Sequence, residues 1–290
     1  MEIIATIRDM QSKANQLRRD AKSIGVVPTM GFLHEGHLSL IEVARSISDV
    51  VVTTLFVNPT QFGPGEDFEH YPRDQERDES LAEGAGTDIL FIPGVNEMYP
   101  EGYRTFVVTE KISSVLEGKF RPAHFRGVTT VVAKLFHIVK PHQAVFGQKD
   151  AQQVAVIRRM VEDLNMGVQL IVAPILREAD GLAMSSRNVY LEPEERKSAA
   201  ALYRALLYAK DAAGRGERDV TVLRGEMMTI LDKEHPAAID YVAFVHEETF
   251  DEVAHLESPE TLAVLAVRFG KTRLIDNIII PVPPGEHNES

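Results

Sequence analysis

The chain has 290 residues, of which 44% are hydrophobic and 26% are charged, values typical of globular proteins and unlike those of disordered or fibrous ones. This length suffices for one large domain or for two domains that each bury a core. The formal net charge of −12 disfavours binding to long nucleic acids, which requires a basic surface. A small anionic ligand, held by a local cluster of cations and backbone N–H groups, is not excluded.

The composition also limits the cellular location and the chemistry. The chain contains no cysteine, which excludes disulfides, thiolate metal ligands and thiol nucleophiles. Its longest apolar stretches, such as 261–267 and 278–282, are far shorter than the roughly 20 residues of a membrane helix. The first 20 residues lack the pattern of a secretory signal and predict an amphipathic helix. We therefore expect a cytoplasmic protein that does not enter a membrane.

Residues 24–172 alternate short apolar runs with longer segments of helical periodicity, which is the pattern of βαβ units. The expected strands are 24–28, 50–57, 88–92, 143–146 and 168–172, and the expected helices are 36–48, 73–83, 125–139 and 151–164. This order predicts an α/β fold with a doubly wound, mostly parallel, Rossmann-like sheet. Residues 58–71 and 93–104 interrupt the pattern as loops, and we expect the first of them to fold over a site.

The pattern changes after residue 187, where helices are followed by strands. The expected elements are helices at 193–213 and 220–233 and strands at 239–245 and 261–269. Such a segregated order favours a separate, smaller α+β domain. We expect residues 1–175 to form the nucleotide-binding domain and residues 176–290 a lid domain, with a disordered tail of sequence PVPPGEHNES.

The stretch PTMGFLHEGHLSLI, residues 28–41, places two histidines at the start of the first predicted helix after a strand. The carboxyl edge of a parallel sheet is its usual ligand-binding edge, and a helix N-terminus offers N–H groups and positive potential to an anion. His34 and His37 are three residues apart and therefore lie on one helical face, where both imidazoles can donate to phosphate oxygens. A single histidine would more often cap or pack, but a pair around a glycine at this turn favours phosphate binding.

Three other motifs nearly match this stretch and fail. Gly31 and Gly36 have the spacing of a phosphate-binding P-loop, but His37 replaces its lysine and Ser39 falls one position late. The Rossmann glycine pattern is absent. The histidine spacing differs from that of the H-E-x-x-H zinc site, and no third ligand is nearby.

The stretch FGQKDAQQ, residues 146–153, again joins a strand to a helix. Lys149 brings a cation, and Asp150 can cap the helix or contact a magnesium ion or a ribose. Gln153 lies one helical turn later and offers both a donor and an acceptor to a hydroxyl-rich substrate. A Lys-Asp pair alone is more often a cap with a solvated charge.

The stretch DGLAMSSRN, residues 180–188, lies just past the expected domain boundary. Ser185, Ser186 and Arg187 put two hydroxyl groups and a guanidinium in a row, a suitable set for polyphosphate oxygens. The alternative is that the two serines cap the helix before the following EPEER sequence.

The stretch NPTQF, residues 58–62, directly follows the second strand of the sheet. It can bring the amide of Gln61 to the same sheet edge as the histidine pair. The basic and polar residues of HFRG, residues 124–127, are candidates to face it.

Together, PTMGFLHEGHLSL, FVNPTQF, HFRGVTTVV, FGQKDAQQ and DGLAMSSRN resemble, in order and spacing, the motifs of the pantoate–β-alanine ligase (pantothenate synthetase) family. That family is part of the adenylyl-transferring superfamily with HIGH-like and KMSKS-like motifs. The resemblance is strong over residues 24–190 and weak beyond them. Arg187 stands where the KMSKS pattern has its second lysine.

The resemblance implies a two-step condensation of ATP, (R)-pantoate and β-alanine. Pantoate first attacks the α-phosphate of ATP to give pantoyl adenylate and pyrophosphate, with Mg²⁺ offsetting charge. The amine of β-alanine then attacks the activated carboxyl group and AMP leaves. Both steps need alignment more than a protein nucleophile. The resemblance also implies a homodimer.

Residue roles carried over from the resemblance fall into three groups. Gln61 and Gln153 would hold pantoate, and Gln61 would also serve β-alanine. The catalytic group would be His34, His37, Lys149, Ser185, Ser186 and Arg187. The ATP-binding group would be Met30, Gly31, Phe32, Leu33, His34, Glu35, Gly36, His37, Gly147, Gln148, Lys149, Asp150, Leu176, Met184, Ser185, Ser186 and Arg187. Mg²⁺ would be held through the ATP phosphates, by protein ligands that the sequence does not identify.

Within this scheme, the role of His37 as a general acid is open to question. Pyrophosphate is a good leaving group and needs little protonation, so stabilisation of charge explains a histidine better than proton donation does.

Three other functions share part of this pattern. A class I aminoacyl-tRNA synthetase would need a tRNA-binding module, for which an acidic chain of 290 residues leaves no obvious room. A phosphopantetheine-type nucleotidylyltransferase would use the two histidines without Gln61 and Gln153. A non-catalytic nucleotide sensor would keep the ATP contacts and lose the same two glutamines.

Overall fold

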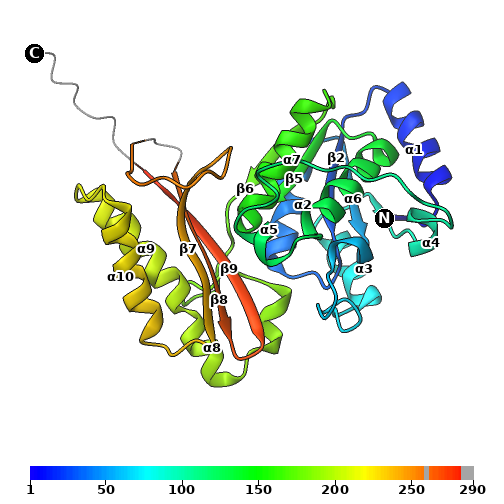
Figure 1. The fold of residues 1–290 in the computed structure, drawn as a ribbon. Helices are drawn as coiled ribbons and strands as arrows, with labels where there is room; N and C mark the ends of the chain where they lie inside the picture. Colours follow the sequence, from blue (N-terminus) through cyan, green and yellow to red (C-terminus); the bar gives the residue numbers. More distant parts are fainter. Residues whose placement is uncertain (258–260, 282–290) are drawn as a thin grey trace, which may run out of the picture. The chain divides into compact units, whose positions relative to one another are not determined.

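The computed structural model of the chain describes residues 1–257 and 261–281, which group into two compact units (Figure 1). The first unit comprises Met1–Gln148 and Gln152–Leu176. The second unit begins at Arg177 and also includes the short segment Lys149–Ala151. Apart from Pro281, the tail predicted to be disordered lies outside the described residues.

The first unit is built on a six-stranded sheet in which every pairing is parallel. The strand order is β1-β4-β3-β2-β5-β6. The strands are β1 Glu2–Ile4, β2 Ile24–Thr29, β3 Val50–Leu55, β4 Ile89–Phe91, β5 Gln143–Gly147 and β6 Gln169–Ala173. This sheet confirms the predicted doubly wound, Rossmann-like fold.

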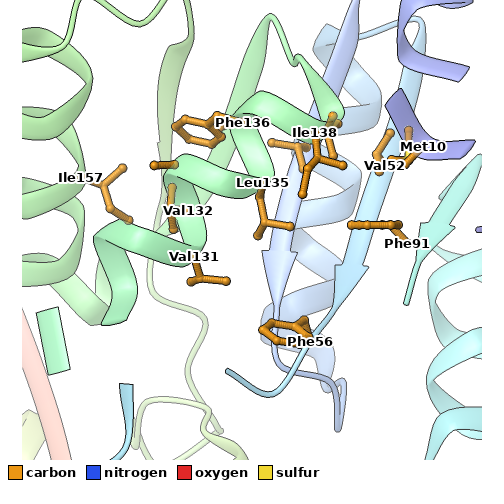
Figure 2. Close-up of a cluster of buried hydrophobic side chains, with 14 of the residues drawn as sticks. Met10, Val52, Phe56, Phe91, Val131, Val132, Leu135, Phe136, Ile138 and Ile157 are labelled. Carbon is orange, nitrogen blue, oxygen red and sulfur yellow. The ribbon is translucent and has the colours of Figure 1, made fainter. Parts of the chain in front are cut away.

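Helices cover both faces of the sheet because consecutive strand residues alternate between two apolar clusters. Val26 and Val52 pack with α1, α6 and α7, whereas Val27 and Val51 pack with α2 and α3. Figure 2 shows part of the first cluster, with side chains of α6 and α7 beside those of the strands. The helices are α1 Ile7–Arg19, α2 Glu35–Ile47, α3 Gln75–Gly84, α4 Val95–Met98, α5 Glu117–Phe120, α6 His124–Val139 and α7 Ala151–Asp163, with 3₁₀ turns η1 Pro59–Gln61 and η2 Gln148–Asp150.

The pairing of β2 with β5 marks the point where the strand order reverses. From β2 the chain proceeds through β3 and β4 toward one edge, and from β5 it proceeds to β6 at the other. Ligands of open parallel sheets bind beyond the carboxyl ends of the strands at such a switch point. The segments that follow β2 and β5 are therefore the ones most favoured to form a site.

The second unit combines helices with an antiparallel sheet of order β7-β8-β9. Alanines of α9, such as Ala201, Ala205 and Ala209, are fully buried against the sheet and α10, because small side chains allow close approach. The elements are η3 Ser186–Tyr190, α8 Pro193–Ala199, α9 Ala201–Gly214, α10 Val220–Asp232, β7 Ala238–His246, β8 Thr261–Phe269 and β9 Thr272–Ile280.

The structure corrects several local predictions. Glu2–Ile4 form an edge strand, so the predicted N-terminal helix starts only at Ile7. The helix predicted over 193–213 is two helices that meet at Ala200, where no proline or glycine signals a break. Gly270–Lys271 form the turn of the β8–β9 hairpin, and β9 is an additional strand beyond the two predicted for this unit. No helix within the described ranges is long and apolar enough to cross a membrane.

Candidate functional site

The turn between β2 and α2 is held in an unusual backbone conformation. Gly31 has a φ of +85° and Phe32 a φ of 50°, so both residues lie in the left-handed region. The turn is tied to the sheet by Thr29, whose Oγ1 donates to the carbonyl of Thr54 at 2.7 Å and accepts from the Gly31 N–H at 3.2 Å. This geometry redirects the chain sharply into α2.

Asp78 of α3 fixes the same turn from the side. Its carboxylate oxygens accept hydrogen bonds from the N–H groups of Phe32 and Leu33 at 2.6 Å and 2.7 Å. The neighbouring Arg77 donates to the Leu33 carbonyl at 2.9 Å, and its guanidinium lies 5.4 Å from the centre of the Phe32 ring. Burial raises the pKa of Asp78, while the two N–H donors oppose the increase. The buried Asp78 carboxylate thus takes the place of water as the hydrogen-bond acceptor for the N–H groups of the turn.

His34 and His37 both cap the N-terminus of α2. Nδ1 of His34 accepts from the Gly36 N–H at 3.1 Å, and Nδ1 of His37 accepts from the His34 N–H at 3.3 Å. The two ring centroids are 4.1 Å apart. The prediction that both imidazoles lie together at the helix start is therefore confirmed.

The capping bonds determine which nitrogen of each neutral ring carries hydrogen. A neutral imidazole has one donor and one acceptor nitrogen, and Nδ1 is the acceptor in both rings. Nε2 of His34 and of His37 is then the N–H donor. Capping and phosphate binding, which were alternatives at the sequence level, are compatible because they use different nitrogens.

The η1 turn, which carries Gln61, is rigidly held. Asn58 donates from Nδ2 to Oε1 of Gln61 at 3.0 Å and to the Gly127 carbonyl at 3.1 Å, and its Oδ1 accepts from Tyr99. Nε2 of Gln61 lies 3.2 Å from the sulfur of Met30. A Cβ atom on Gly127 would lie 2.4 Å from the Thr60 carbonyl oxygen, so only glycine allows α6 to approach this closely.

Arg121 and His124 anchor the loop that contains Gln61, which confirms that the HFRG motif faces the NPTQF motif. Arg121 makes a bidentate ion pair with Glu66, at 3.0 Å and 2.7 Å. Its Nη1 is 3.3 Å from Nε2 of His124, and Nδ1 of His124 is 3.1 Å from the carbonyl oxygen of Gln61. Since arginine only donates, Nε2 of His124 must accept and Nδ1–H must donate.

The electrostatic surroundings of this anchor favour a neutral histidine. Burial, with a smaller contribution from the charge of Arg121, lowers the pKa of His124 to about 4. Burial raises the pKa of Glu66, but Arg121 outweighs it and the net shift is downward. The anchor therefore combines an ionised carboxylate, a cation and an uncharged imidazole at neutral pH.

The segment after β5 carries the second predicted motif. Gly147, Gln148, Lys149 and Gln153 are half-buried, and Asp150 is exposed. Gln148–Asp150 form the 3₁₀ turn η2 rather than the first turn of the helix. By the grouping of the chain, Gly147 and Gln148 belong to the first unit and Lys149 and Asp150 to the second.

The Met184–Arg187 stretch lies in the second unit, whereas Leu176 is the last residue of the first unit and is exposed. Oγ of Ser185 accepts from the Arg187 N–H at 3.2 Å and so caps η3. The alternative that these serines cap a helix before EPEER is confirmed for Ser185, which caps the 3₁₀ turn η3, whereas α8 is capped by Glu192 and Glu195.

Among the described residues, no three histidine, aspartate or glutamate side chains are grouped so that they could hold a metal ion. Magnesium generally keeps few protein ligands and is bound largely by substrate phosphates.

Comparison with known proteins assigns the chain to a family. Residues 2–279 match the model of the family described as Pantoate-beta-alanine ligase. The chain belongs to the pantoate–β-alanine ligase family. A relative named "Pantothenate synthetase" from Acetivibrio thermocellus is 55% identical over 97% of this chain and 100% of its own length.

Solved structures of the family agree with the fold. Pantothenate synthetase from Thermus thermophilus has a TM-score of 0.92 and 46% identity, covering 98% of this chain and 100% of that one. The ligase from Francisella tularensis, described as complexed with beta-gamma ATP and beta-alanine, has a TM-score of 0.80 and 34% identity over the same shares.

Sequence patterns do not reveal every residue that shapes the site. Asp78 reads only as part of a helix, and its role depends on a contact with Phe32, which lies 46 residues earlier in the chain. Tyr99 and Arg121 are also missed. For Tyr99 the available signal is its place in the predicted loop 93–104, and Arg121 has no such signal.

We predict that Asp78→Asn destabilises the protein by about 2 kcal/mol, because an amide can no longer accept from both backbone N–H groups. Urea unfolding measures this change. Glu76→Gln, on the exposed side of the same helix, is the control and should change stability little. Equal effects of the two substitutions would contradict the role of Asp78 as a clamp.

We predict that His124 makes stability depend on pH between about 6.5 and 4. The unfolded chain protonates His124 near pH 6.5, whereas the folded chain resists protonation down to about pH 4. Stability from this group is complete above about pH 6.5 and falls as the pH decreases, by at most about 3 kcal/mol. His124→Gln keeps a donor for Gln61 but cannot titrate.

Urea unfolding of both proteins at about pH 7 and about pH 5 tests this prediction. The wild-type protein should lose more stability than His124→Gln on acidification. Parallel losses would show that His124 is not held neutral in the folded state.

Proposed function

We propose that this chain condenses (R)-pantoate with β-alanine in two steps, through an enzyme-bound pantoyl adenylate, and forms pantothenate, AMP and pyrophosphate from ATP. Two findings support this function. The chain belongs to the ligase family, and it is 55% identical to a relative named pantothenate synthetase over the whole length of that relative. The observation that carries it is the pair of Nε2–H donors of His34 and His37 at a helix start beside the switch point.

In the first step, a pantoate carboxylate oxygen attacks the α-phosphorus of ATP. A new P–O bond forms, the bond to the β-phosphate oxygen breaks, and pyrophosphate leaves with the electron pair. The Nε2–H groups of His34 and His37, at the positive end of the α2 dipole, bind the phosphates and stabilise the charge that develops there. The proposed ATP-binding set also includes Gly147–Asp150, Leu176 and Met184–Arg187.

In the second step, the β-alanine nitrogen attacks the acyl carbon of pantoyl adenylate. A C–N bond forms, the C–O bond to AMP breaks, and the amine loses a proton. We assign Gln61 and Gln153 to pantoate, and Gln61 also to β-alanine. The hydrogen bonds that hold η1 support this role for Gln61, because a fixed amide can orient a substrate without losing conformational entropy.

Magnesium enters this scheme as part of the MgATP substrate. The phosphates would supply most of its ligands, as is usual for magnesium bound with a nucleotide. Lys149, Ser185, Ser186 and Arg187 supply cationic or hydroxyl groups for the same phosphates.

The rival functions have less support. The relative from Acetivibrio thermocellus matches 97% of this chain, and both Gln61 and Gln153 are present, as expected for an enzyme with a second and a third substrate. Cytoplasmic location, homodimer formation and the absence of nucleic-acid binding stay predictions.

A stepwise assay tests the proposed function. Pyrophosphate should be released when ATP and pantoate are present together, and AMP should appear only after β-alanine is added. Release of pyrophosphate without pantoate, or with 4′-phosphopantetheine in its place, would contradict the proposal and favour a nucleotidylyltransferase.

We predict that His37→Gln retains more adenylation activity than His37→Ala, because glutamine can still donate a hydrogen bond to phosphate. Loss of the donor should reduce the rate by about 100-fold, and its replacement by an amide should restore much of that loss. Isotopic exchange between pyrophosphate and ATP in the presence of pantoate measures this step. If both variants lose all activity equally, His37 acts as an acid rather than as a hydrogen-bond donor.

A further inference from the structure

Lys149 follows strand β5 of the first unit, yet the segment Lys149–Ala151 groups with the second unit. One contact in that unit is made by Asn277 of β9. Its Nδ2 donates to the carbonyl oxygen of Lys149 at 3.0 Å, although the two residues are 128 positions apart in the sequence. The Lys149 turn is therefore bound to a strand far from it along the chain.

Asn277 is itself held in one orientation. Its side chain is almost fully buried, and its backbone carbonyl accepts from Nη2 of Arg177 at 3.2 Å. Arg177 also makes a bidentate ion pair with the buried Asp276, at 2.6 Å and 2.9 Å, and lies 3.9 Å from the centre of the Tyr203 ring. Because the Asp276 carboxylate is buried and ion-paired, and the Arg177 guanidinium stacks on Tyr203, the backbone of β9 around Asn277 has little conformational freedom.

The positive charge of Lys149 also acts on this cluster. Burial raises the pKa of Asp276, the bond to Arg177 opposes this increase most, and the charge of Lys149 opposes it to a smaller extent. The geometric contact of the Lys149 turn with this cluster is the hydrogen bond from Asn277.

Strand β9 has a second connection to the predicted site. It packs against η3, the turn that begins at Ser186 and contains Arg187. One strand therefore supports both the Lys149 turn and the turn that carries a hydroxyl group and a guanidinium of the predicted phosphate-binding set.

We propose that Asn277 is a positioning residue for adenylation, which acts by holding the Lys149 carbonyl and so aims the Lys149 side chain at the phosphates of ATP. This inference rests on the proposed function. Asn277 itself contacts no substrate in this scheme. It restricts the backbone of the Lys149 turn, so that the long lysine side chain starts from a fixed point.

A double-mutant cycle tests the proposal, because a residue that acts only through Lys149 has no effect once the Lys149 ammonium is removed. Pyrophosphate–ATP exchange with pantoate is measured for the wild-type protein, Asn277→Ala, Lys149→Ala and the double variant. Asn277→Ala should reduce the exchange rate about tenfold, as expected for one lost hydrogen bond. In the Lys149→Ala background the same substitution should change it less than about twofold.

A purely structural role gives a different result. In that case the two reductions multiply in the double variant, or Asn277→Ala lowers the melting temperature without changing the exchange rate of the folded protein, and either outcome overturns the proposal. Asn277→Asp removes the donor while keeping the shape, and it replaces Asn277→Ala in the cycle if the latter does not fold. Ile279→Ala, an exposed substitution on the same strand, is the matched control and should leave the exchange unchanged.

Failure of the proposed function looks different from failure of this inference. If the wild-type protein shows no pantoate-dependent exchange, the reaction has been assigned wrongly. If the wild-type protein and Ile279→Ala exchange normally and the effects of Asn277→Ala and Lys149→Ala multiply, only the role of Asn277 is wrong.

Discussion

The parallel pairing of β2 with β5 is the constraint on which the candidate site of the first unit depends. These strands are neighbours in the sheet, but the chain leaves them toward opposite edges. No crossover helix can cover the space directly beyond their carboxyl ends, because one connection leads to each side. The HxGH turn and the FGQKD turn both begin there, which explains why two motifs far apart in the sequence are adjacent in the sheet.

Near the β2–β5 switch point, buried polar side chains form hydrogen bonds with neighbouring protein groups instead of with water, and these bonds fix the backbone. Asp78 holds the turn after β2, and Asn58 holds the turn after β3. Each of these side chains satisfies several backbone or amide groups at once, so removing one leaves several partners unsatisfied. Such turns are stiff before any ligand binds, and stiffness of this kind reduces the entropy lost on ordering two substrates and a nucleotide.

The sequence predicts those features that depend on local pattern. Strands β2, β3 and β5 are found because each is a short apolar run, and the histidine pair because its spacing matches one helical face. Strand β1 has three residues, too few to show a period, and β9 mixes Arg273, Asp276 and Asn277 with apolar residues. Asp276 and Asn277 are buried because they bind Arg177 and Lys149, and a contact over about a hundred residues leaves no trace in a local window.

The same limit applies to the site. Gln61 and His124 both lie in motifs that the sequence singles out, but Glu66 and Arg121 do not, since each of these two alone reads as an ordinary surface polar group. Their role comes from contacts between distant residues: Arg121 and His124 bond the Gln61 carbonyl, and Glu66 pairs with Arg121. Residues that touch a substrate are therefore easier to infer from sequence than those that hold them in place.

Gln152 and Gln153 illustrate how a structural residue can direct a functional neighbour. Gln152 is buried, donates to the carbonyls of Ile112 and Val115, and accepts from the Glu117 N–H. These three bonds prevent α7 from turning about its own axis. Successive residues of an α-helix point in directions about 100° apart around its axis. The hydrogen bonds of Gln152 therefore also determine the direction in which the next residue, Gln153, leaves the helix.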